Sequence, residues 1–208
     1  MIRARGAHEV MVHQVCEGER GEKNRDTSQG TQDSHGPPRM ETIIFIQRLA
    51  VQLVGDFMKL TEEPEIVTWP VTRYVFIEKV GPFQDTAPQA WQNLHQLVPQ
   101  ISEHNRITGY LSLYKVQGKV YRAGVAIVDG PAKLPDGVEY LEFQGGKYSR
   151  FVLTGPHSDL PQACGRVFAI VGEKKIRQRD DFCIENYAND PRTTPEEQLI
   201  TQILIPTA

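Results

Sequence analysis

The residue types that could perform catalysis or bind a metal are spread along this 208-residue chain without a recognisable motif. The three cysteines, Cys16, Cys164 and Cys183, lie far apart and lack the close Cys/His spacing of a zinc site or a disulfide framework. The six histidines have no partner at metal-binding spacing, and no Gly-x-Ser-x-Gly nucleophile elbow occurs. We therefore expect no metal, no cofactor and no catalytic residue, with a Ser/His/Asp triad assembled from distant positions left open.

One stretch places a carboxylate beside aromatic residues. Residues 182–188 form a β-rich run, and strand alternation puts Glu185 and Tyr187 on one face and Phe182 and Ile184 on the other. If helices cover the face of Phe182 and Ile184, Glu185 faces a groove on the opposite side. A carboxylate walled by aromatic rings is a receptor for a lipophilic cation, because desolvation makes an unpaired charge costly and a matching cation relieves that cost.

The aromatic candidates for the walls of this groove come from several segments. Each ring face would add about 0.5 to 2 kcal/mol of attraction for a cation, depending on how dry the site is. Each ring could equally belong to the core, and for Trp91, on the apolar stripe of a predicted helix, the core is the better interpretation. Glu185 itself could be a solvated charge on an open sheet face. The predicted ligand-binding residues are Glu185, Tyr187, Tyr110, Tyr114, Tyr148, Trp69 and Trp91.

An internal repeat indicates which elements position these residues. Residues 73–85 and 147–159 match at an offset of 74, because a basic residue, a Tyr, a Gly-Pro pair and an Asp coincide. At an offset of 73, the Pro-Gln-Ala at 88–90 coincides with that at 161–163. So many ordered matches, with a single shift of the offset, indicate a duplicated unit.

Each half of the repeat has the same predicted secondary structure. A β-rich run ends at a Gly-Pro pair, because proline lacks the donor of a sheet ladder and glycine permits the turn. A helix with one apolar stripe follows, and two strands close the unit. One such unit is too small for a core, so we expect an α+β fold in which both units form one antiparallel sheet, with both helices on one face and a central groove on a pseudo-twofold axis. The predicted strands are 73–80, 109–116, 121–128, 147–154, 182–188 and 199–205, and the helical stripes run from Ala87 to Ile101 and from Leu160 to Val171.

Composition divides the chain into three parts. Residues 1–38 lack apolar periodicity and are rich in Gly, charged and small polar residues, which is typical of a disordered segment or of an extension from a mis-assigned start codon. Residues 41–57 are apolar on much of a helical wheel, and we interpret them as an accessory helix. The folded domain is predicted at 59–208, with repeats at 66–128 and 138–206.

Charge and hydropathy limit the kinds of partner that the chain can bind. The net charge of −3 provides no field that would gather nucleic acid, and no apolar stretch of about twenty residues could span a bilayer. The odd, scattered cysteines fit a reducing compartment, so we predict a cytoplasmic location. We expect a small-molecule ligand, no direct contact with nucleic acid or membrane, and leave a protein partner open.

Several motifs of the chain match one protein family in their order. They are Leu60 to Val67, the turns Gly81-Pro82 and Gly155-Pro156, Gly145 to Tyr148, Glu185 to Pro191 and Ile203 to Pro206. The chain from about 59 to 207 thereby resembles the GyrI-like small-molecule-binding family, also called the AraC-type effector-binding domain. The resemblance implies a duplicated strand-helix-strand-strand fold and a multidrug-binding groove for lipophilic, often cationic compounds. It also implies that Glu185 is the pocket carboxylate, because Glu185 lies two residues before the Tyr of the Glu-x-Tyr-x-Asn-Asp-Pro motif.

These observations predict non-enzymatic binding of small, lipophilic, cationic compounds, for sequestration or for ligand sensing. One alternative is hydrolysis of electrophilic small molecules with Glu185 as general base, which turnover of a reactive substrate would reveal. The resemblance argues against it, because residues 169–172 lack a tryptophan that the family often has there. The other alternative is a protein-interaction module, such as a topoisomerase modulator, and loss of a partner on deletion of 41–57 would support it.

We predict that residues 1–38 are dispensable for folding, because a segment of this composition buries too little surface to stabilise the domain. A chain beginning at Met40 should unfold at the same temperature as the full chain, as measured by circular dichroism. A chain beginning at Met58 tests the predicted helix separately. A loss of several degrees on removal of 1–38 alone would show instead that this segment packs on the domain.

Overall fold

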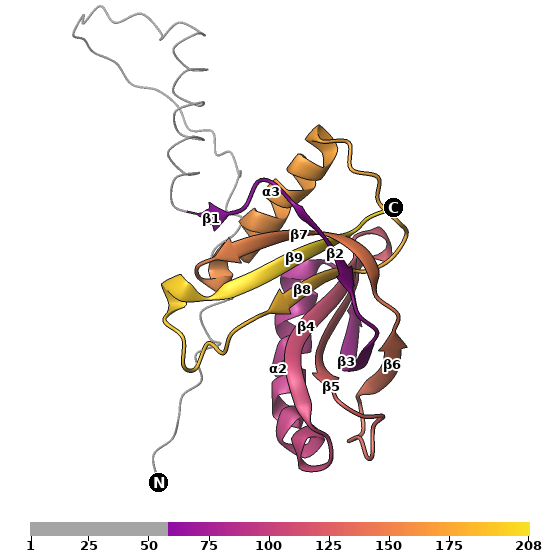
Figure 1. Ribbon diagram of the computed structural model, residues 1–208. Helices are drawn as coiled ribbons and strands as arrows, with labels where there is room; N and C mark the ends of the chain where they lie inside the picture. Colours follow the sequence, from indigo (N-terminus) through magenta and orange to yellow (C-terminus); the bar gives the residue numbers. More distant parts are fainter. Residues whose placement is uncertain (1–57) are drawn as a thin grey trace, which may run out of the picture. The chain divides into compact units, whose positions relative to one another are not determined.

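The computed structural model describes residues 58–208, and this part of the chain is built on one antiparallel sheet of nine strands with two α-helices (Figure 1). The predictions for 1–38 and 41–57 concern residues outside this range. In the described part, no helix is long and apolar enough to cross a membrane. The strands are β1 (Lys59–Leu60), β2 (Glu65–Trp69), β3 (Thr72–Val80), β4 (Ile107–Lys115), β5 (Val120–Ile127), β6 (Glu139–Phe143), β7 (Gly146–Thr154), β8 (Cys183–Tyr187) and β9 (Ile200–Pro206), the helices are α2 (Phe83–His104) and α3 (Leu160–Glu173), and 3-10 turns lie at Gln117–Lys119, His157–Asp159 and Glu196–Gln198.

The strand order places β4 and β8 in the middle of the sheet. The order is β1-β7-β9-β8-β4-β5-β3-β6, and β2 also pairs with β7. The six inner strands lie in the order β7-β9-β8-β4-β5-β3. This order is symmetric about its centre if β3, β4 and β5 correspond to β7, β8 and β9. The outer strands follow the same rule, because β2, which precedes β3, pairs with β7, and β6, which precedes β7, pairs with β3. Two copies of one unit around a twofold axis would produce this order, and the duplication itself stays a prediction.

The predicted α+β fold, with one antiparallel sheet and both helices on one face, is confirmed. Each Gly-Pro pair ends a strand and precedes a helix, and Gly81 and Gly155 adopt φ values of 146° and 139°, which side-chain-bearing residues rarely adopt. Strands β2 and β6 were not predicted. Their hydrophobic patterns are weak, with Ile66 53% exposed, and pairing with β7 and β3 gives them strand structure.

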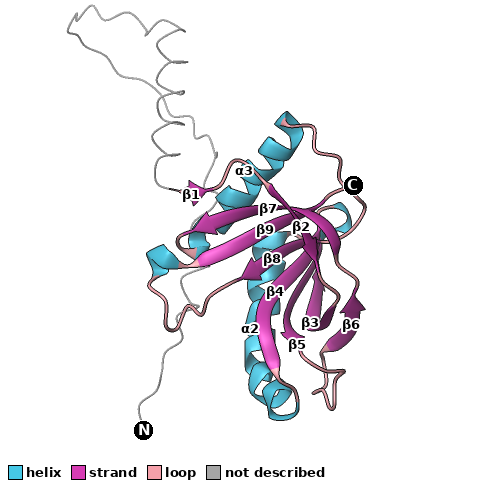
Figure 2. Cartoon of the chain, in the orientation of Figure 1, coloured by secondary structure: helices cyan, strands magenta, loops and turns pink. Residues whose placement is uncertain are grey.

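Both helices pack on the same face of the sheet, behind it in the view of Figures 1 and 2. The apolar stripe of α2 buries Ala90, Leu94 and Ile101, and that of α3 buries five residues, all in one cluster with side chains of the sheet. We call this side the helix face. Burial of these two stripes is the main source of stability on this side of the sheet. The buried residues of α3 are Leu160, Ala163, Val167, Ile170 and Val171.

The expectation that the helices cover Phe182 and Ile184 is wrong. Cys183 belongs to the apolar cluster of the helix face, whereas Ile184 belongs to a second cluster on the opposite face with Tyr74 and Phe76. Alternation along β8 assigned the residues to two faces correctly. Both faces of this sheet are apolar, so the pattern of one strand does not reveal which face the helices cover.

The second apolar cluster contains a tyrosine, Tyr74, whose side chain lies across the neighbouring strand β5. Tyr74 is fully buried, and its hydroxyl donates to the carbonyl oxygens of Leu111 at 3.0 Å and Arg122 at 2.9 Å. Its ring lies over Gly124, where an added Cβ would come within 2.4 Å of the ring carbons and 2.5 Å of the Val75 carbonyl oxygen. Gly124 therefore provides the space that the buried ring occupies.

We predict that Gly124→Ala lowers the free energy of unfolding by about 2 to 3 kcal/mol, because neither the buried ring nor the backbone can yield to the added methyl group. Urea denaturation measures the change. Gly165→Ala is the matched control, because Gly165 is exposed on α3 with open space around its Cβ position. This control should gain about 0.5 to 1 kcal/mol from helix propensity. Equal effects of the two substitutions would contradict the role of Gly124.

Candidate ligand-binding site

The two central strands form the floor between the helices. Helix α2 packs against β3 and β5, and α3 packs against β7, so β4 and β8 lie between the areas that the helices cover. The register of β4 and β8 places Ser112 opposite Glu185, at the middle of their five paired positions. Glu185 lies on the helix face of the sheet, in the space between α2 and α3.

Glu185 is buried, with 7% of the residue's surface exposed, and its carboxylate accepts hydrogen bonds from four side chains. Its Oε2 accepts from Ser112 Oγ at 2.6 Å, from the Tyr187 hydroxyl at 3.2 Å and from the Tyr121 hydroxyl at 3.3 Å. Its Oε1 accepts from Cys164 Sγ at 3.6 Å. Burial raises the pKa of Glu185 above its ordinary value, and the four hydrogen bonds offset part of this shift.

The groups around the carboxylate remain neutral donors. Burial raises the pKa of the Tyr121 hydroxyl and of the Cys164 thiol well above their ordinary values, and repulsion by Glu185 adds to both shifts. The same two causes raise the pKa of Cys183 to about 12. Among the described residues, none of the ion pairs includes Glu185. An ionised Glu185 is therefore hydrogen-bonded but lacks a positive partner within the described part of the protein.

Aromatic rings surround one end of the floor. The Trp91 indole donates to the Tyr121 hydroxyl at 3.0 Å and meets the Tyr187 ring edge to face at 5.2 Å between ring centroids. The His157 ring meets Tyr187 at the same centroid distance from the other helix side. Trp91 of α2 and His157 of the turn before α3 thus each pack a ring against Tyr187, whose hydroxyl contacts the carboxylate.

The other rings continue this lining along the floor. Phe83, at the start of α2, packs edge to face on Tyr114 at 5.7 Å and against Tyr121 at 5.9 Å between centroids. Tyr110 stacks on His95 of α2 at 6.3 Å. Tyr114 and Tyr121 are buried, whereas Tyr110 is half-buried. The carboxylate therefore lies among aromatic side chains from α2, from the 3-10 turn before α3 and from strands β4, β5 and β8.

The structure brings together five of the seven predicted site residues. Glu185, Tyr187, Tyr110, Tyr114 and Trp91 lie on the helix face, and Trp91 contacts the site while it also packs on the core. Tyr148 and Trp69 do not join them.

Tyr148 and Trp69 lie on the opposite face, in the second apolar cluster. The Tyr148 hydroxyl donates to the Phe182 carbonyl oxygen at 3.1 Å, and the Trp69 indole donates to Thr72 Oγ1 at 3.1 Å. These two residues were misplaced for the reason that also misplaced the helices. The sheet buries aromatic residues on both faces, and the residue type alone does not show which face a ring occupies.

Sequence reasoning did not identify Tyr121, Cys164 and Phe83 as site residues. Tyr121 lies opposite Tyr114 in the structure. The predicted strands 109–116 and 121–128 would instead pair residue 116 with residue 121, so their bounds did not bring Tyr121 opposite Tyr114. Cys164 and Phe83 lie at the helix sides of the groove, and only the packing of the helices on the sheet brings them to the floor.

A single antiparallel sheet, with two helices on one face and an aromatic-lined carboxylate between them, defines a class of α+β ligand-binding domain. The model of the GyrI-like small molecule binding domain matches residues 62–208, and the chain belongs to this family. None of the curated protein sequences compared with the chain matches it.

Solved structures show the same fold at low sequence identity. The EcmrR C-terminal domain has a TM-score of 0.57 at 13% identity, covering 73% of this chain and 98% of its own. SAV2435 bound to tetraphenylphosphonium has a TM-score of 0.54 at 20% identity, covering 70% and 94%. A putative transcription regulation protein from Staphylococcus aureus MU50 has a TM-score of 0.53 at 19% identity, covering 70% and 97%.

We predict that Glu185→Gln stabilises the domain at neutral and alkaline pH. The pKa of Glu185 is raised in the folded chain, so its contribution to stability is full below the unfolded pKa and is lost as the pH rises through the folded pKa. The amide keeps the shape of the side chain and an acceptor oxygen for Ser112, and it carries no charge to desolvate.

Thermal unfolding from pH 4 to pH 8 measures this effect. The variant should melt a few degrees above the natural chain at pH 8, and the difference should shrink toward pH 4. Glu142→Gln is the control, because the Glu142 side chain is 51% exposed and its substitution should change little at any pH. A Glu185 variant that is less stable at pH 8 than at pH 4, relative to the natural chain, would contradict the cost of burial.

Proposed function

We propose that this domain binds small, lipophilic cations in the groove between α2 and α3, with Glu185 as the counter-charge. One observation carries the proposal: the carboxylate of a residue that is 7% exposed lies among aromatic rings and has no positive partner among the described residues. Binding of this kind serves sequestration or ligand sensing.

The physical reason is the cost of a buried charge. The hydrogen bonds to Glu185 come from neutral hydroxyl and thiol groups, which stabilise the carboxylate but do not neutralise it. A cation in the groove supplies the missing charge, lowers the pKa of Glu185 and gains attraction from the faces of the surrounding rings. Apolar substituents of the ligand displace water from the rest of the groove.

Ligand entry requires movement of aromatic side chains. Tyr114 and Tyr121 are 4% and 5% exposed; Tyr121 donates to the carboxylate, and Tyr114 contacts Cys164 beside it. Trp91, Tyr110 and Tyr187 are half-buried at the edge of the site. A bulky ligand enters when these outer rings change rotamer, while the hydrogen-bonded floor of Ser112 and Glu185 stays in place.

The ligand in one neighbouring structure supports the choice of chemistry. SAV2435 was solved bound to tetraphenylphosphonium, a permanently charged cation with four phenyl groups. Its likeness to this chain shows the fold alone, so the ligand class is transferred here as part of the proposal. Tetraphenylphosphonium is a suitable first probe, because its charge does not change with pH.

The geometry favours binding over general-base hydrolysis. Oε2 of Glu185 accepts three hydrogen bonds, which lower its basicity, and Oε1 faces the thiol of Cys164. A carboxylate held by four donors is arranged to retain its charge for a ligand. A general base needs a free lone pair directed at a water molecule.

We predict that Glu185→Gln weakens the binding of tetraphenylphosphonium tenfold to a hundredfold. A charge pair in a partly dry groove contributes about 1.5 to 3 kcal/mol, and the amide removes it without changing the shape of the site. Calorimetric titration measures the affinity, with neutral triphenylphosphine oxide as the uncharged comparison. Its affinity should be the same in both chains.

The pH dependence provides a second readout of the same prediction. Affinity for tetraphenylphosphonium should rise as the pH increases through the raised pKa of Glu185, and the Gln variant should show no such rise. Glu142→Gln should behave as the natural chain does. Equal losses for the charged and the neutral ligand would assign Glu185 a packing role, and no loss for either would place binding elsewhere.

A further inference from the structure

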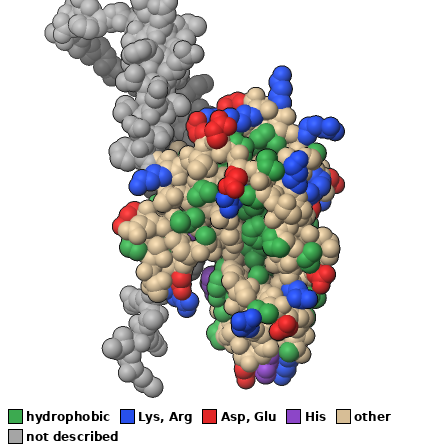
Figure 3. All heavy atoms as spheres, in the orientation of Figure 1, with side chains coloured by type: hydrophobic (Ala, Val, Ile, Leu, Met, Phe, Trp, Pro, Cys, Tyr) green, Lys and Arg blue, Asp and Glu red, His purple; other side chains and the backbone are tan. Residues whose placement is uncertain are grey.

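A cavity of about 330 Å³ lies on the face of the sheet opposite Glu185. Leu111 and Asn186, which line it, each adjoin one of the paired residues Ser112 and Glu185 and point to the other face. Figure 3 shows hydrophobic side chains gathered down the middle of the molecule on the side toward the viewer, where the sheet covers the helices in Figure 1. The lining consists of Trp69, Pro70, Val71, Thr72, Arg73, Thr108, Gly109, Leu111, Ala126, Ile127, Val128 and Asn186.

One residue of the lining is a glycine at a position where the other half of the sheet has a phenylalanine. Gly109 lies three residues before Ser112, as Phe182 lies three residues before Glu185, and Ser112 and Glu185 are paired. The Phe182 ring lies 4.4 Å from the Arg122 guanidinium, measured to the ring centroid. At Gly109 an added Cβ would meet nothing within 4 Å.

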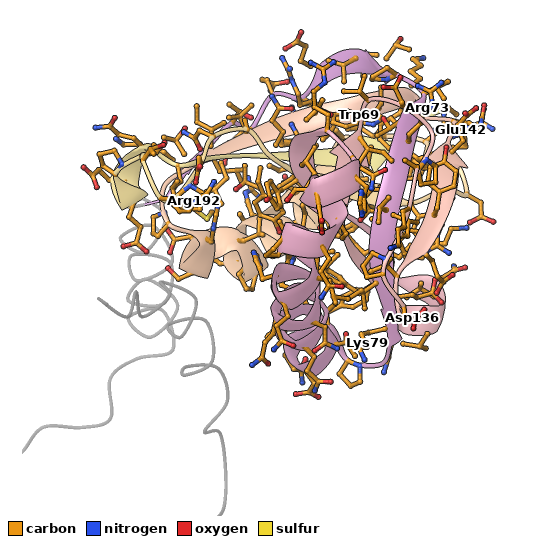
Figure 4. The ribbon with its side chains drawn as sticks, turned by 90° about the horizontal axis from the view of Figure 1, so that it is seen from below. Trp69, Arg73, Lys79, Asp136, Glu142 and Arg192 are labelled. Carbon is orange, nitrogen blue, oxygen red and sulfur yellow. The ribbon has the colours of Figure 1, made fainter. Side chains whose placement is uncertain are left out.

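The lining carries one charge, which is positive. The Arg73 side chain is 46% exposed, and its Nη1 donates to the Val128 carbonyl oxygen at 2.7 Å. Its Nε lies 4.0 Å from Glu142, the one acidic group that it approaches among the described residues, and Glu142 is outside the lining. Figure 4 shows Trp69, Arg73 and Glu142 at the same end of the sheet. The remaining donors of the guanidinium fork are directed to solvent or to a ligand.

We propose that this cavity binds a small planar aromatic carboxylate. The aromatic ring occupies the space that Gly109 leaves open and packs beside the Trp69 indole. The carboxylate pairs with Arg73, whose planar fork matches a carboxylate. The volume is at the small end of the range for ligand sites, which suits a single fused ring system.

The site is independent of the groove that holds Glu185, because the two lie on opposite faces of the sheet. Each contains one of the two tryptophans of the chain. The indole N–H of Trp69 donates to Thr72 Oγ1, and that of Trp91 donates to the Tyr121 hydroxyl. The two indole N–H resonances in a ¹⁵N-correlated NMR spectrum therefore report the two sites separately.

The experiment titrates the full chain with indole-3-acetate, neutral indole and cationic tryptamine. Indole-3-acetate should shift the Trp69 indole resonance at saturable concentrations and leave that of Trp91 in place. Neutral indole should bind about tenfold more weakly, and tryptamine more weakly still, because only the carboxylate of indole-3-acetate can pair with Arg73. Equal binding of all three probes, or a shift confined to Trp91, would overturn the proposal.

Substitutions at Gly109 test the location of the ring. Gly109→Phe should fill the cavity and abolish the shift of Trp69, whereas Gly109→Ala, whose Cβ meets nothing, should leave binding nearly unchanged. Arg73→Gln should lower the affinity for indole-3-acetate about tenfold and leave that for neutral indole unchanged. Thermal unfolding confirms that each variant is folded.

Glu185→Gln should not change the shift of the Trp69 indole resonance on titration with indole-3-acetate. A wrong prediction for this cavity can therefore be told apart from a wrong prediction for the cation site at Glu185. If both Gly109→Phe and Arg73→Gln still bind indole-3-acetate as the natural chain does, the ligand binds elsewhere and the proposal is wrong.

Discussion

The antiparallel pairing of β4 with β8 is the constraint on which the rest of the site depends. It joins the two halves of the sheet, and its register puts Ser112 opposite Glu185 at the centre. A shift of one residue would turn the Glu185 side chain to the other face, away from the hydroxyl groups of Tyr121 and Tyr187. The two helices then bury a carboxylate that only neutral donors contact. The raised pKa of Glu185 is thus a consequence of where two strands meet.

The sheet carries an apolar cluster on each face. Much of the packing that stabilises the domain therefore lies away from the candidate ligand site. On the helix face, the stripes of α2 and α3 pack beside the groove and leave the central strands to polar and aromatic side chains. On the other face, Tyr74 lies across β5 above Gly124, and its hydroxyl satisfies two buried carbonyl groups. The packing of this second face thus stabilises the sheet independently of the polar side chains around Glu185.

Differences between corresponding positions of the two halves create the chemistry. Ser112 and Glu185 face each other, yet only one of them carries a charge. On the flanking strands, Tyr121 pairs with Tyr114 and reaches the carboxylate, whereas Thr201 pairs with Tyr187, and its buried hydroxyl has no partner among the described residues. The near-symmetric strand order therefore provides the frame, and differences between the side chains of the two halves place the buried carboxylate and its hydrogen bonds.

Local patterns were sufficient to determine both helices and the six long strands β3, β4, β5, β7, β8 and β9, but not β1, β2 and β6. The Gly-Pro pairs, the two apolar stripes and the alternation in 182–188 predicted these elements, because such signals depend only on backbone geometry and period. The motif ending in Asn189-Asp190-Pro191 directed attention to Glu185 through a family resemblance. What only the tertiary structure decided was the side of the sheet. With both faces apolar, no strand reveals which one the helices cover, and so Tyr148 and Trp69 were assigned to a groove from which the sheet separates them, while Cys164 and Phe83 reached it through helix packing alone.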